Sequence, residues 1–300
     1  MSLIIGDSTL PVFDVIVCGS LHLDIVVDAP HLPQIDETVP GSGWKKICGG
    51  KGGNQAAMAA KAGAKCAMIG RVGNDDFGQA LVSNLTSNKV DATSVSVDAD
   101  HGSGMSVAIV NQAKDYGAVI VSGANLFIDP VDAATFWQKL GLARVLILQN
   151  EIPEHVNIAI AKVAKKSGAI VVLNAAPARQ MSDDLLKLVD LLVVNRVEAE
   201  MMSGAAITDP QSAIDILPNI SREGQVVIVT LGALGLVYLD KNREQHFIAP
   251  KKIQVQSTHG AGDCFVGVLA KELATGLDIN TACNIANIAA ANFVAGLGSS

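Results

Sequence analysis

The chain has 300 residues, of which 49% are hydrophobic and 17% are charged, and its formal net charge at pH 7 is -7. This composition excludes a disordered chain and is typical of a parallel sheet buried between helices. The acidic balance disfavours nucleic acid and anionic membrane surfaces as partners, because both repel a negatively charged protein.

Membrane and export signals are not found in the pattern of apolar residues. The most apolar stretch, residues 226–239, is interrupted by Thr230 and two glycines and is shorter than the roughly 20 residues of a membrane-spanning helix. The N-terminus lacks the basic and apolar segments of a secretory signal, so we expect a cytoplasmic protein. The cysteines are scattered without metal-binding spacing, which predicts reduced thiols. They are Cys18, Cys48, Cys66, Cys264 and Cys283.

The chain before residue 130 contains two stretches with antiparallel strand patterns. Residues 1–13 precede the first clear strand, and residues 21–47 and 95–122 then carry short alternating segments, such as 95–97 and 106–110, separated by Gly, Asp and Asn. We expect these two stretches to form a small β-sheet at the edge of a larger one. Such a sheet can cover an active site as a lid or hold two copies of the chain together in a homodimer.

From about residue 130 the chain alternates regularly between strand and helix patterns. One helix is predicted over 153–166, with Pro153 in its first turn. Apolar runs predict strands at 145–147, 170–173, 191–194 and 226–230. Strands that alternate with helices pair in parallel through right-handed crossovers. We therefore predict one α/β domain over 1–300, with a central, mostly parallel sheet covered by helices on both faces.

A glycine-rich turn at residues 257–263 lies between an expected strand at 253–255 and an expected helix at 264–269. The small residues Gly260, Ala261 and Gly262 let the backbone approach a ligand, and the first N–H groups of the helix point outward without partners. This arrangement suits the charge of a transferring phosphoryl group. Asp263 is placed to take a hydroxyl proton; alternatively, it only caps the helix.

A second motif, residues 49–55, surrounds Lys51 with four glycines and opens a helix expected at 56–62. Ordering so many glycines is entropically costly, which indicates a loop whose backbone touches a ligand. Lys51 and Asn54 can then bind sugar hydroxyls. The alternative is a flexible surface loop. The sequence contains neither a Walker A motif nor GxGxxG, which argues against a nicotinamide dehydrogenase.

The two glycine motifs together resemble the hallmark motifs of the ribokinase-like carbohydrate kinases, the phosphofructokinase B group, and are most similar to its ribokinase branch. The resemblance covers roughly residues 14–300, and further family motifs follow in the same order. They are Gly19-Ser20 with Asp24, Val72-Gly73-Asn74-Asp75 with Gly78, Gly123-Ala124-Asn125, Asn174 with Ala176-Pro177-Ala178, Asn195 with Glu198-Ala199-Glu200, and Thr230-Leu231-Gly232 with Gly235.

The resemblance implies an enzyme that transfers the γ-phosphoryl group of ATP to a small free sugar and uses Mg²⁺ as a cofactor. The similarity to the ribokinase branch points to ribose as this sugar. Asp263 matches the catalytic base, beside Gly260, Ala261 and Gly262. The implied sugar contacts are His22, Asp24, Gly50, Lys51, Gly52, Gly53, Asn54, Glu151 and Asp263. The implied nucleotide contacts are Asn195, Glu198, Thr230, Leu231, Gly232, Ala233, Leu234, Gly235, Gly262 and Asn287, and Glu198 also matches the residue that holds Mg²⁺ through water.

The residue pattern agrees with several of these roles. Asn195 and Glu198 lie one helical turn apart after a strand, at the edge where α/β proteins bind ligands, although a capping Asn would give the same pattern. Glu151 also follows an apolar strand. Asn287 lies in a helix over 282–294 that is apolar nearly all round, so we expect it to be buried and to bind an adenine edge or neighbouring backbone.

Two positions depart from the family pattern. His22 stands where ribokinases commonly have Asn. Ser257 opens the glycine turn where an acidic residue is usual, and His259 follows it. The family's acidic residue helps to hold a monovalent cation, so Ser257 and His259 predict a weak site and little or no activation by K⁺.

Three readings compete with a ribose kinase. A fructose kinase or a nucleoside kinase of the same family would share the motifs, although few aromatic residues are available to stack on a nucleobase. A sugar-binding regulatory protein without turnover would keep the fold, but the intact Lys51 and Asp263 argue against it.

Overall fold

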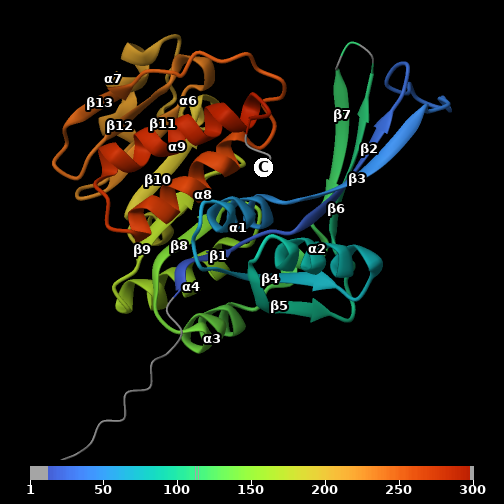
Figure 1. Cartoon of the computed structure of the whole chain (residues 1–300), viewed down its shortest axis with the longest axis horizontal. Coiled ribbons are helices and arrows are strands. Elements are labelled where there is room, and N and C mark those ends of the chain that lie inside the picture. The colour runs from blue at the N-terminus through green and yellow to red at the C-terminus, as the bar shows by residue number, and fades with distance from the viewer. Residues whose placement is uncertain (1–12, 112, 114, 298–300) are drawn as a thin grey trace, which may run out of the picture.

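Two β-sheets organise the chain in the computed structural model, which describes residues 13–111, 113 and 115–297 (Figure 1). Within these residues the larger sheet has nine strands: seven neighbouring strands run in parallel, and the two at the other edge each pair antiparallel with their inner neighbour. In spatial order they are β13 (Gln245–Ile248), β12 (Leu236–Leu239), β11 (Val226–Thr230), β10 (Leu191–Asn195), β9 (Ile170–Asn174), β8 (Ala143–Gln149), β1 (Phe13–Cys18), β4 (Cys66–Gly73) and β5 (Asp91–Asp98).

Helices cover both faces of this sheet, as the alternating pattern predicts. One face carries α3 (Pro130–Leu140), α4 (Glu154–Lys166), α5 (Asp183–Leu186), α6 (Arg196–Ser203) and α7 (Pro210–Ile220). The other carries α1 (Lys51–Lys61), α2 (Asp76–Ser87), α8 (Ala261–Ala274) and α9 (Ile279–Val294). Short 3₁₀ turns occur at η1 (Gly123–Phe127) and η2 (Gly232–Leu234).

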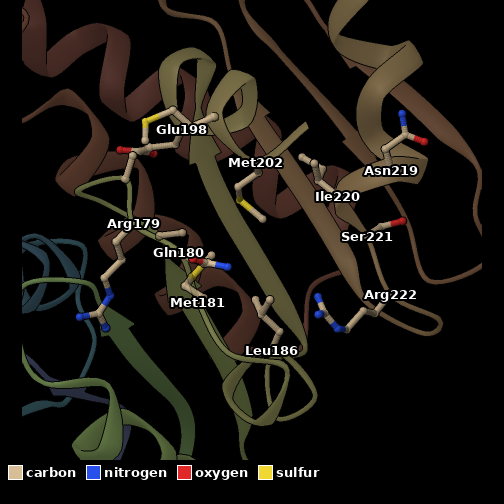
Figure 2. Close-up of a pocket in the computed structure, with 13 residues that line it drawn as sticks. Arg179, Gln180, Met181, Leu186, Glu198, Met202, Asn219, Ile220, Ser221 and Arg222 are labelled. Carbon is tan, nitrogen blue, oxygen red and sulfur yellow. The ribbon is translucent and has the colours of Figure 1, made fainter. Parts of the chain in front are cut away.

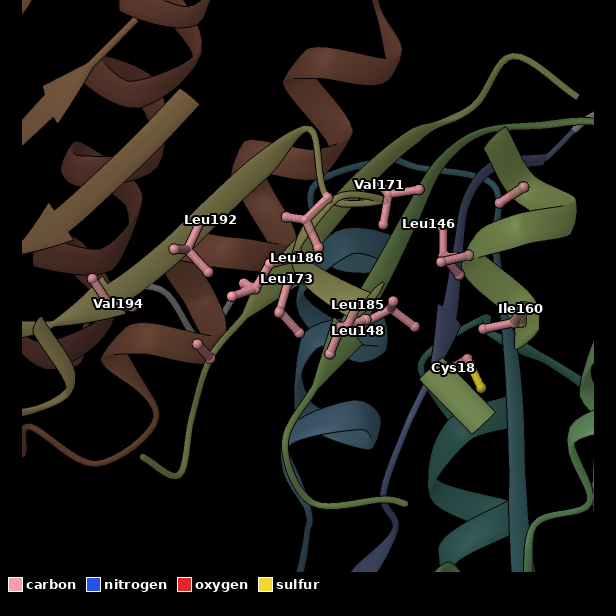
Figure 3. Packing of buried hydrophobic residues seen from close by; sticks show 14 of the residues in the cluster. Cys18, Leu146, Leu148, Ile160, Val171, Leu173, Leu185, Leu186, Leu192 and Val194 are labelled. Carbon is pink, nitrogen blue, oxygen red and sulfur yellow. The ribbon is translucent and has the colours of Figure 1, made fainter. Parts of the chain in front are cut away.

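Alternate residues of each central strand supply two separate hydrophobic cores. In β8, Leu146 and Leu148 pack with Ile160 of α4 on one face, where Figure 3 shows the packed side chains. Val145 and Ile147 point to the other face and pack with the cluster that includes α1 and α8. A strand that is buried on both faces reads as a continuous apolar run, which is why these strands are predicted from the sequence.

Helices α1 and α8 approach each other unusually closely. A Cβ atom at Gly267 would lie 2.7 Å from the carbonyl oxygen of Gln55 and 2.8 Å from the amide nitrogen of Ala59. Only a residue without a side chain permits this contact, because non-bonded carbon and oxygen atoms do not approach so closely. The contact fixes the start of α1 relative to the start of α8.

The smaller sheet projects from the body of the molecule, on the right in Figure 1. Its four strands within the described residues, in spatial order, are β3 (Gly43–Gly49), β2 (His22–Asp28), β6 (Gly104–Val110) and β7 (Tyr116–Val121). The outer pairs are antiparallel, but β2 and β6 pair in parallel, so the sheet is mixed. Residues 95–97, expected in this sheet, instead belong to β5 of the larger sheet, because they pair in parallel with β4.

Three further expectations need correction. Residues 253–255 do not form a strand; they continue beyond β13 as an extended connection, whose alternating sequence resembles a strand. Pro153 is the N-cap of α4, one position before its first turn. Helix α9 is not buried all round, since Ile285 and Ile288 are exposed. Among the described helices, none combines the length and apolar character that a membrane crossing requires.

Candidate active site

Glu151, Asp263 and the predicted site residues of the motif at 49–55 lie where the carboxyl ends of β1 and β8 meet the first turns of α1 and α8. The glycine motif at 49–55 is only partly a loop, because α1 begins at Lys51. Gly50 precedes it with φ of 83°, a left-handed value that favours glycine. Gly52 and Gly53 are buried, and a Cβ atom at Gly52 would lie 2.7 Å from the backbone of Ser20. Gly50, Lys51 and Asn54 remain partly exposed at the site.

Glu151 joins the turn after β8 to the start of α1. Its Oε2 atom accepts hydrogen bonds from the Lys51 backbone N–H at 2.9 Å and from the Ser20 hydroxyl. The same oxygen lies 3.8 Å from Nδ1 of His22. Ser20 belongs to one of the family motifs, but the sequence gives no sign of its contact with Glu151, because 131 residues separate the two.

His22 and Asp24 reach the site from β2 of the smaller sheet. His22 is buried, and burial lowers the pKa of its imidazole, although Glu151 and Asp24 act in the opposite direction. Its ring Nε2 lies 3.4 Å from the amide nitrogen of Asn125. Asp24 accepts a hydrogen bond from Ser106 of the neighbouring strand. The His22 imidazole therefore lies close to the carboxylates of Glu151 and Asp24.

Asp263 lies in the first turn of α8 and is nearly buried. Its Oδ2 accepts a hydrogen bond from the Asn54 amide at 3.0 Å, and its Oδ1 accepts one from the Gln55 amide at 2.9 Å. Burial raises the pKa of this carboxyl, whereas Lys51 and the two amides lower it, and Glu151 raises it. A carboxylate whose pKa is raised towards neutrality is a stronger base than an exposed one.

The turn before Asp263 leaves room for an anion. Gly260 is the N-cap of α8 in the left-handed conformation, with φ of 80°. A Cβ atom at Gly262 would meet no atom within 4 Å, so the space beside the first turn is open. The first backbone N–H groups of a helix have no intrahelical acceptor, and its N-terminus attracts negative charge. Ser257 and His259, before this turn, are exposed, and the Ser257 hydroxyl accepts the His259 N–H at 3.3 Å.

Asn195 and Glu198 form a capping box at the start of α6. The Asn195 backbone N–H and side-chain amide donate to the two oxygens of Glu198 at 2.8 and 2.9 Å, and Asn195 Oδ1 accepts the Glu198 N–H at 3.0 Å. The capping role considered for Asn195 is therefore confirmed. Burial raises the pKa of Glu198, while the bond from Asn195 and the charge of Lys51 lower it.

The oxygen atoms that the protein offers near Glu198 suit a Mg²⁺ ion that is held mainly by phosphate oxygens and water. A protein site for Mg²⁺ next to a nucleotide commonly supplies only one or two carboxylates, and Glu198 is one. A cluster of three close acidic or histidine groups does occur within the described residues, but it lies on the β12–β13 hairpin at Asp240, Glu244 and His246. Glu198 is therefore suited to bind a water of the ion, as its sequence motif predicts.

The predicted nucleotide residues fall into two groups in space. Thr230 pairs with Asn195 across β11 and β10, and the exposed turn η2 follows it. Gly232, Ala233 and Leu234 form this turn, and the buried Leu231 and Gly235 flank it. Asn287 lies on α9, where it is only partly buried, and its amide donates to the carbonyl of Ala249 at 3.0 Å. The alternative in which Asn287 binds neighbouring backbone is thus realised, and its side-chain oxygen remains available.

A cavity of about 740 Å³ lies away from Asp263, on the face that carries α5, α6 and α7 (Figure 2). Glu198 stands at one end and Arg222 at the other, with Met202 and Leu186 between them. It exists because α5 has a single turn and leaves part of this face uncovered. Of the predicted site residues only Glu198 lines this cavity.

Residues 12–300 match the family model of the pfkB family carbohydrate kinases, and the chain belongs to this family. It is a carbohydrate kinase of the ribokinase-like type. The chain is 35% identical over 263 residues to the ribokinase of Mus musculus, with 87% of this chain and 81% of that protein covered. It is 30% identical over 287 residues to the deoxyribokinase of Salmonella typhi, with 95% and 94% covered.

Solved structures share the fold. The Arabidopsis thaliana ribokinase complexed with ribose and ATP aligns with a TM-score of 0.86 and 26% identity, over 94% of this chain and 92% of that one. The predicted α/β architecture with its small second sheet is thereby confirmed.

Proposed function

We propose that this carbohydrate kinase transfers the γ-phosphoryl group of ATP to a hydroxyl of free ribose, with Asp263 as the base. The observation that carries the proposal is the position of Asp263, a nearly buried carboxylate at a helix N-terminus beside open space. The relatives named ribokinase and the ribose and ATP in the Arabidopsis complex support the choice of substrates.

The sugar site comprises the polar groups around Lys51. Asp24, Asn54 and Glu151 offer acceptors and donors for several hydroxyls, as a free polyol requires. The positive charge of Lys51 lowers the pKa of Asp263, Glu198 and His22, so it favours the ionised form of the two carboxyls. Gly50 adds partly exposed backbone to the site, whereas Gly52 and Gly53 are buried.

The nucleotide site extends from Asn195 and Thr230 across η2 to Asn287 and the first turn of α8. Mg²⁺, held near Glu198 through water, would supply positive charge to the β- and γ-phosphates. Ser257 and His259 would form at most a weak site for a monovalent cation, because neither carries a fixed negative charge.

The reaction is an in-line displacement in which positioning and electrostatics supply most of the acceleration. Asp263 accepts the proton of the sugar hydroxyl as its oxygen bonds to the γ-phosphorus. The bond between that phosphorus and the oxygen bridging to the β-phosphate breaks, and ADP leaves with the electron pair. The N–H groups at 260–262 hold the negative charge of the transferring group.

The smaller sheet has two further roles in this proposal. It acts as a lid within a single domain over 1–300, since His22 and Asp24 of β2 face the sugar. Its exposed Trp44, Val119 and Ile120 suit contact with a second copy of the chain, which gives a homodimer. Five free cysteines fit a reducing compartment such as the cytoplasm.

The test combines one variant with an acceptor screen. Asp263→Asn should lower kcat by about 10²–10⁴-fold while ATP and sugar still bind. If calorimetry shows that the variant fails to bind ATP, the catalytic role is wrong. The wild-type kcat/KM for ribose should exceed that for fructose, fructose 6-phosphate and adenosine, and a tenfold preference for any of these three would replace ribose as acceptor.

A further inference from the structure

A chain of buried amides connects the interior of the larger sheet to the carboxylate of Asp263. Gln149, the last residue of β8, donates through Nε2 to Oε1 of Gln55 at 2.8 Å. Gln55, in α1, donates through Nε2 both to Oδ1 of Asp263 and to Oδ1 of Asn174, each at 2.9 Å. Gln55 and Gln149 are completely buried, so bulk water cannot replace either of them.

The hydrogen bonds leave the Gln55 amide one orientation. Its nitrogen has two hydrogens and faces two oxygens, while its oxygen faces the Gln149 amide nitrogen. A flipped amide would set oxygen against two oxygens and nitrogen against nitrogen, and buried polar groups without partners are strongly unfavourable. In this arrangement Gln55 presents an N–H to Asp263.

Gln149 is held by its main chain and by the shape of its surroundings, because within the described residues its buried Oε1 atom has no hydrogen-bond partner. Its main-chain carbonyl accepts the Asn157 amide at 2.8 Å. A Cβ atom at Gly19 would lie 1.8 Å from Oε1 of Gln149, so this side chain occupies the space that Gly19 leaves free. The glycine of the Gly19-Ser20 motif thus admits the amide that orients Gln55.

We propose that Gln55 and Gln149 are positioning residues for the catalytic base. Gln55 holds Oδ1 of Asp263 towards the interior, which leaves Oδ2, on the side of the partly exposed Asn54, to receive the hydroxyl proton. Gln149 prevents the Gln55 amide from turning over. This inference rests on the proposed role of Asp263 in sugar phosphorylation.

The hydrogen bond from Gln55 also favours the ionised form of Asp263. The groups that act on Asp263 from the packed elements are Lys51, Asn54 and Gln55 of α1, which lower its pKa, and Glu151 after β8, which raises it together with burial. Removing the Gln55 donor raises the pKa of Asp263. Since the base must be ionised to accept a proton, activity is then lost at a higher pH as the solution is acidified.

The experiment is the pH profile of kcat/KM for the sugar at saturating ATP, measured for matched variants. Gln55→Met should move the acidic limb up by about one pH unit, the size expected for a lost hydrogen bond to a charged group. Gln55→Glu should move it further, because a second carboxylate then faces Asp263. Gln149→Met should give a smaller shift in the same direction, since Gln55 keeps its donor but loses its fixed orientation.

Gln225→Met is the control. Gln225 is equally an amide in the interior, but it donates to the carbonyls of Leu186 and Val189, away from the site. This variant should lose thermal stability and retain the wild-type acidic limb. If the limbs of both Gln55 variants coincide with that of Gln225→Met, Gln55 is only structural and the proposal is wrong. If Gln55→Met does not fold, Gln55→Glu, which keeps length and a polar end, carries the same comparison.

A measurement without turnover separates this inference from the proposed function. The infrared carboxyl band that disappears in Asp263→Asn reports the protonation of Asp263 directly. Its titration should move to higher pH in Gln55→Met and Gln55→Glu even if the true acceptor is not among the sugars tested. An unmoved titration refutes the positioning role of Gln55, whereas absence of sugar phosphorylation by the wild type refutes the proposed function.

Discussion

Gly262→Ala separates the anion site at the start of α8 from the stability of the helix. Gly262 does not have a left-handed backbone, and its added Cβ atom would meet no atom within 4 Å. Alanine reduces the conformational freedom of the unfolded chain, so the variant should be more stable by about 0.5–1 kcal/mol. For a chain of 300 residues, an unfolding entropy of about 2.1 cal/mol/K per residue converts this into a rise in Tm of roughly 1–2 °C.

The same methyl group should damage catalysis. It projects into the open space where the transferring phosphoryl group would meet the N–H groups of the first turn. Loss of one donor from a comparable anion hole reduces kcat by about 10²–10³-fold, which corresponds to about 2.7–4 kcal/mol, and we expect a loss of this order. The variant is therefore predicted to be slightly more stable and far less active.

Two assays on the same preparation test this prediction. Differential scanning calorimetry gives Tm, and a coupled assay of ADP release at saturating sugar gives kcat. An unchanged kcat would show that the phosphoryl group does not occupy this space. A Tm lowered by several degrees would instead show that the space beside Gly262 is not open, and the reasoning from its geometry would be refuted.

Three other predictions concern helix contact, cation dependence and thiol reactivity. Gly267→Ala, in the same helix, should lower the unfolding free energy by about 1–3 kcal/mol in urea titrations, because its Cβ would lie 2.7 Å from the Gln55 carbonyl oxygen; unchanged stability would contradict the close contact. Potassium chloride at ~100 mM and matched ionic strength should activate the enzyme little, because Ser257 is neutral, and strong saturable activation would show that carbonyl oxygens suffice. At pH 8, native protein should react with a thiol reagent first at the partly exposed Cys48, because burial raises the pKa of Cys18 to about 12 and that of Cys264 to about 11; equal labelling of all five thiols without unfolding would refute this.

The sequence predicted the parallel sheet well because its strands are buried on both faces. Val145 and Leu146 are both apolar, and such a run has few other interpretations in a strand–helix alternation. The strand predicted at 253–255 was wrong because an exposed connection can also alternate between apolar and polar residues. Helix α9 was expected to be buried because its outward residues, such as Ile288, are apolar as well.

The two glycine motifs located the chemical groups of the site but not their supports. Lys51 and Asp263 lie in motifs whose composition alone indicates ligand contact. Gln149 carries no such signal, and 94 residues separate it from Gln55. Only the strand order, which sets β8 between β1 and β9, brings the Gln149 amide next to Gln55, which in turn contacts Asp263.

The close contact of α1 and α8 at Gly267 holds one part of the site together, and the other part comes from the smaller sheet. Lys51 at the start of α1 and Asp263 at the start of α8 belong to one rigid block, which meets His22 and Asp24 from a separate sheet. Under the proposed function, substitutions on β2 should change which sugar is accepted more than they change the geometry around Asp263. A family built on this plan can diversify its acceptors while its phosphoryl chemistry stays the same.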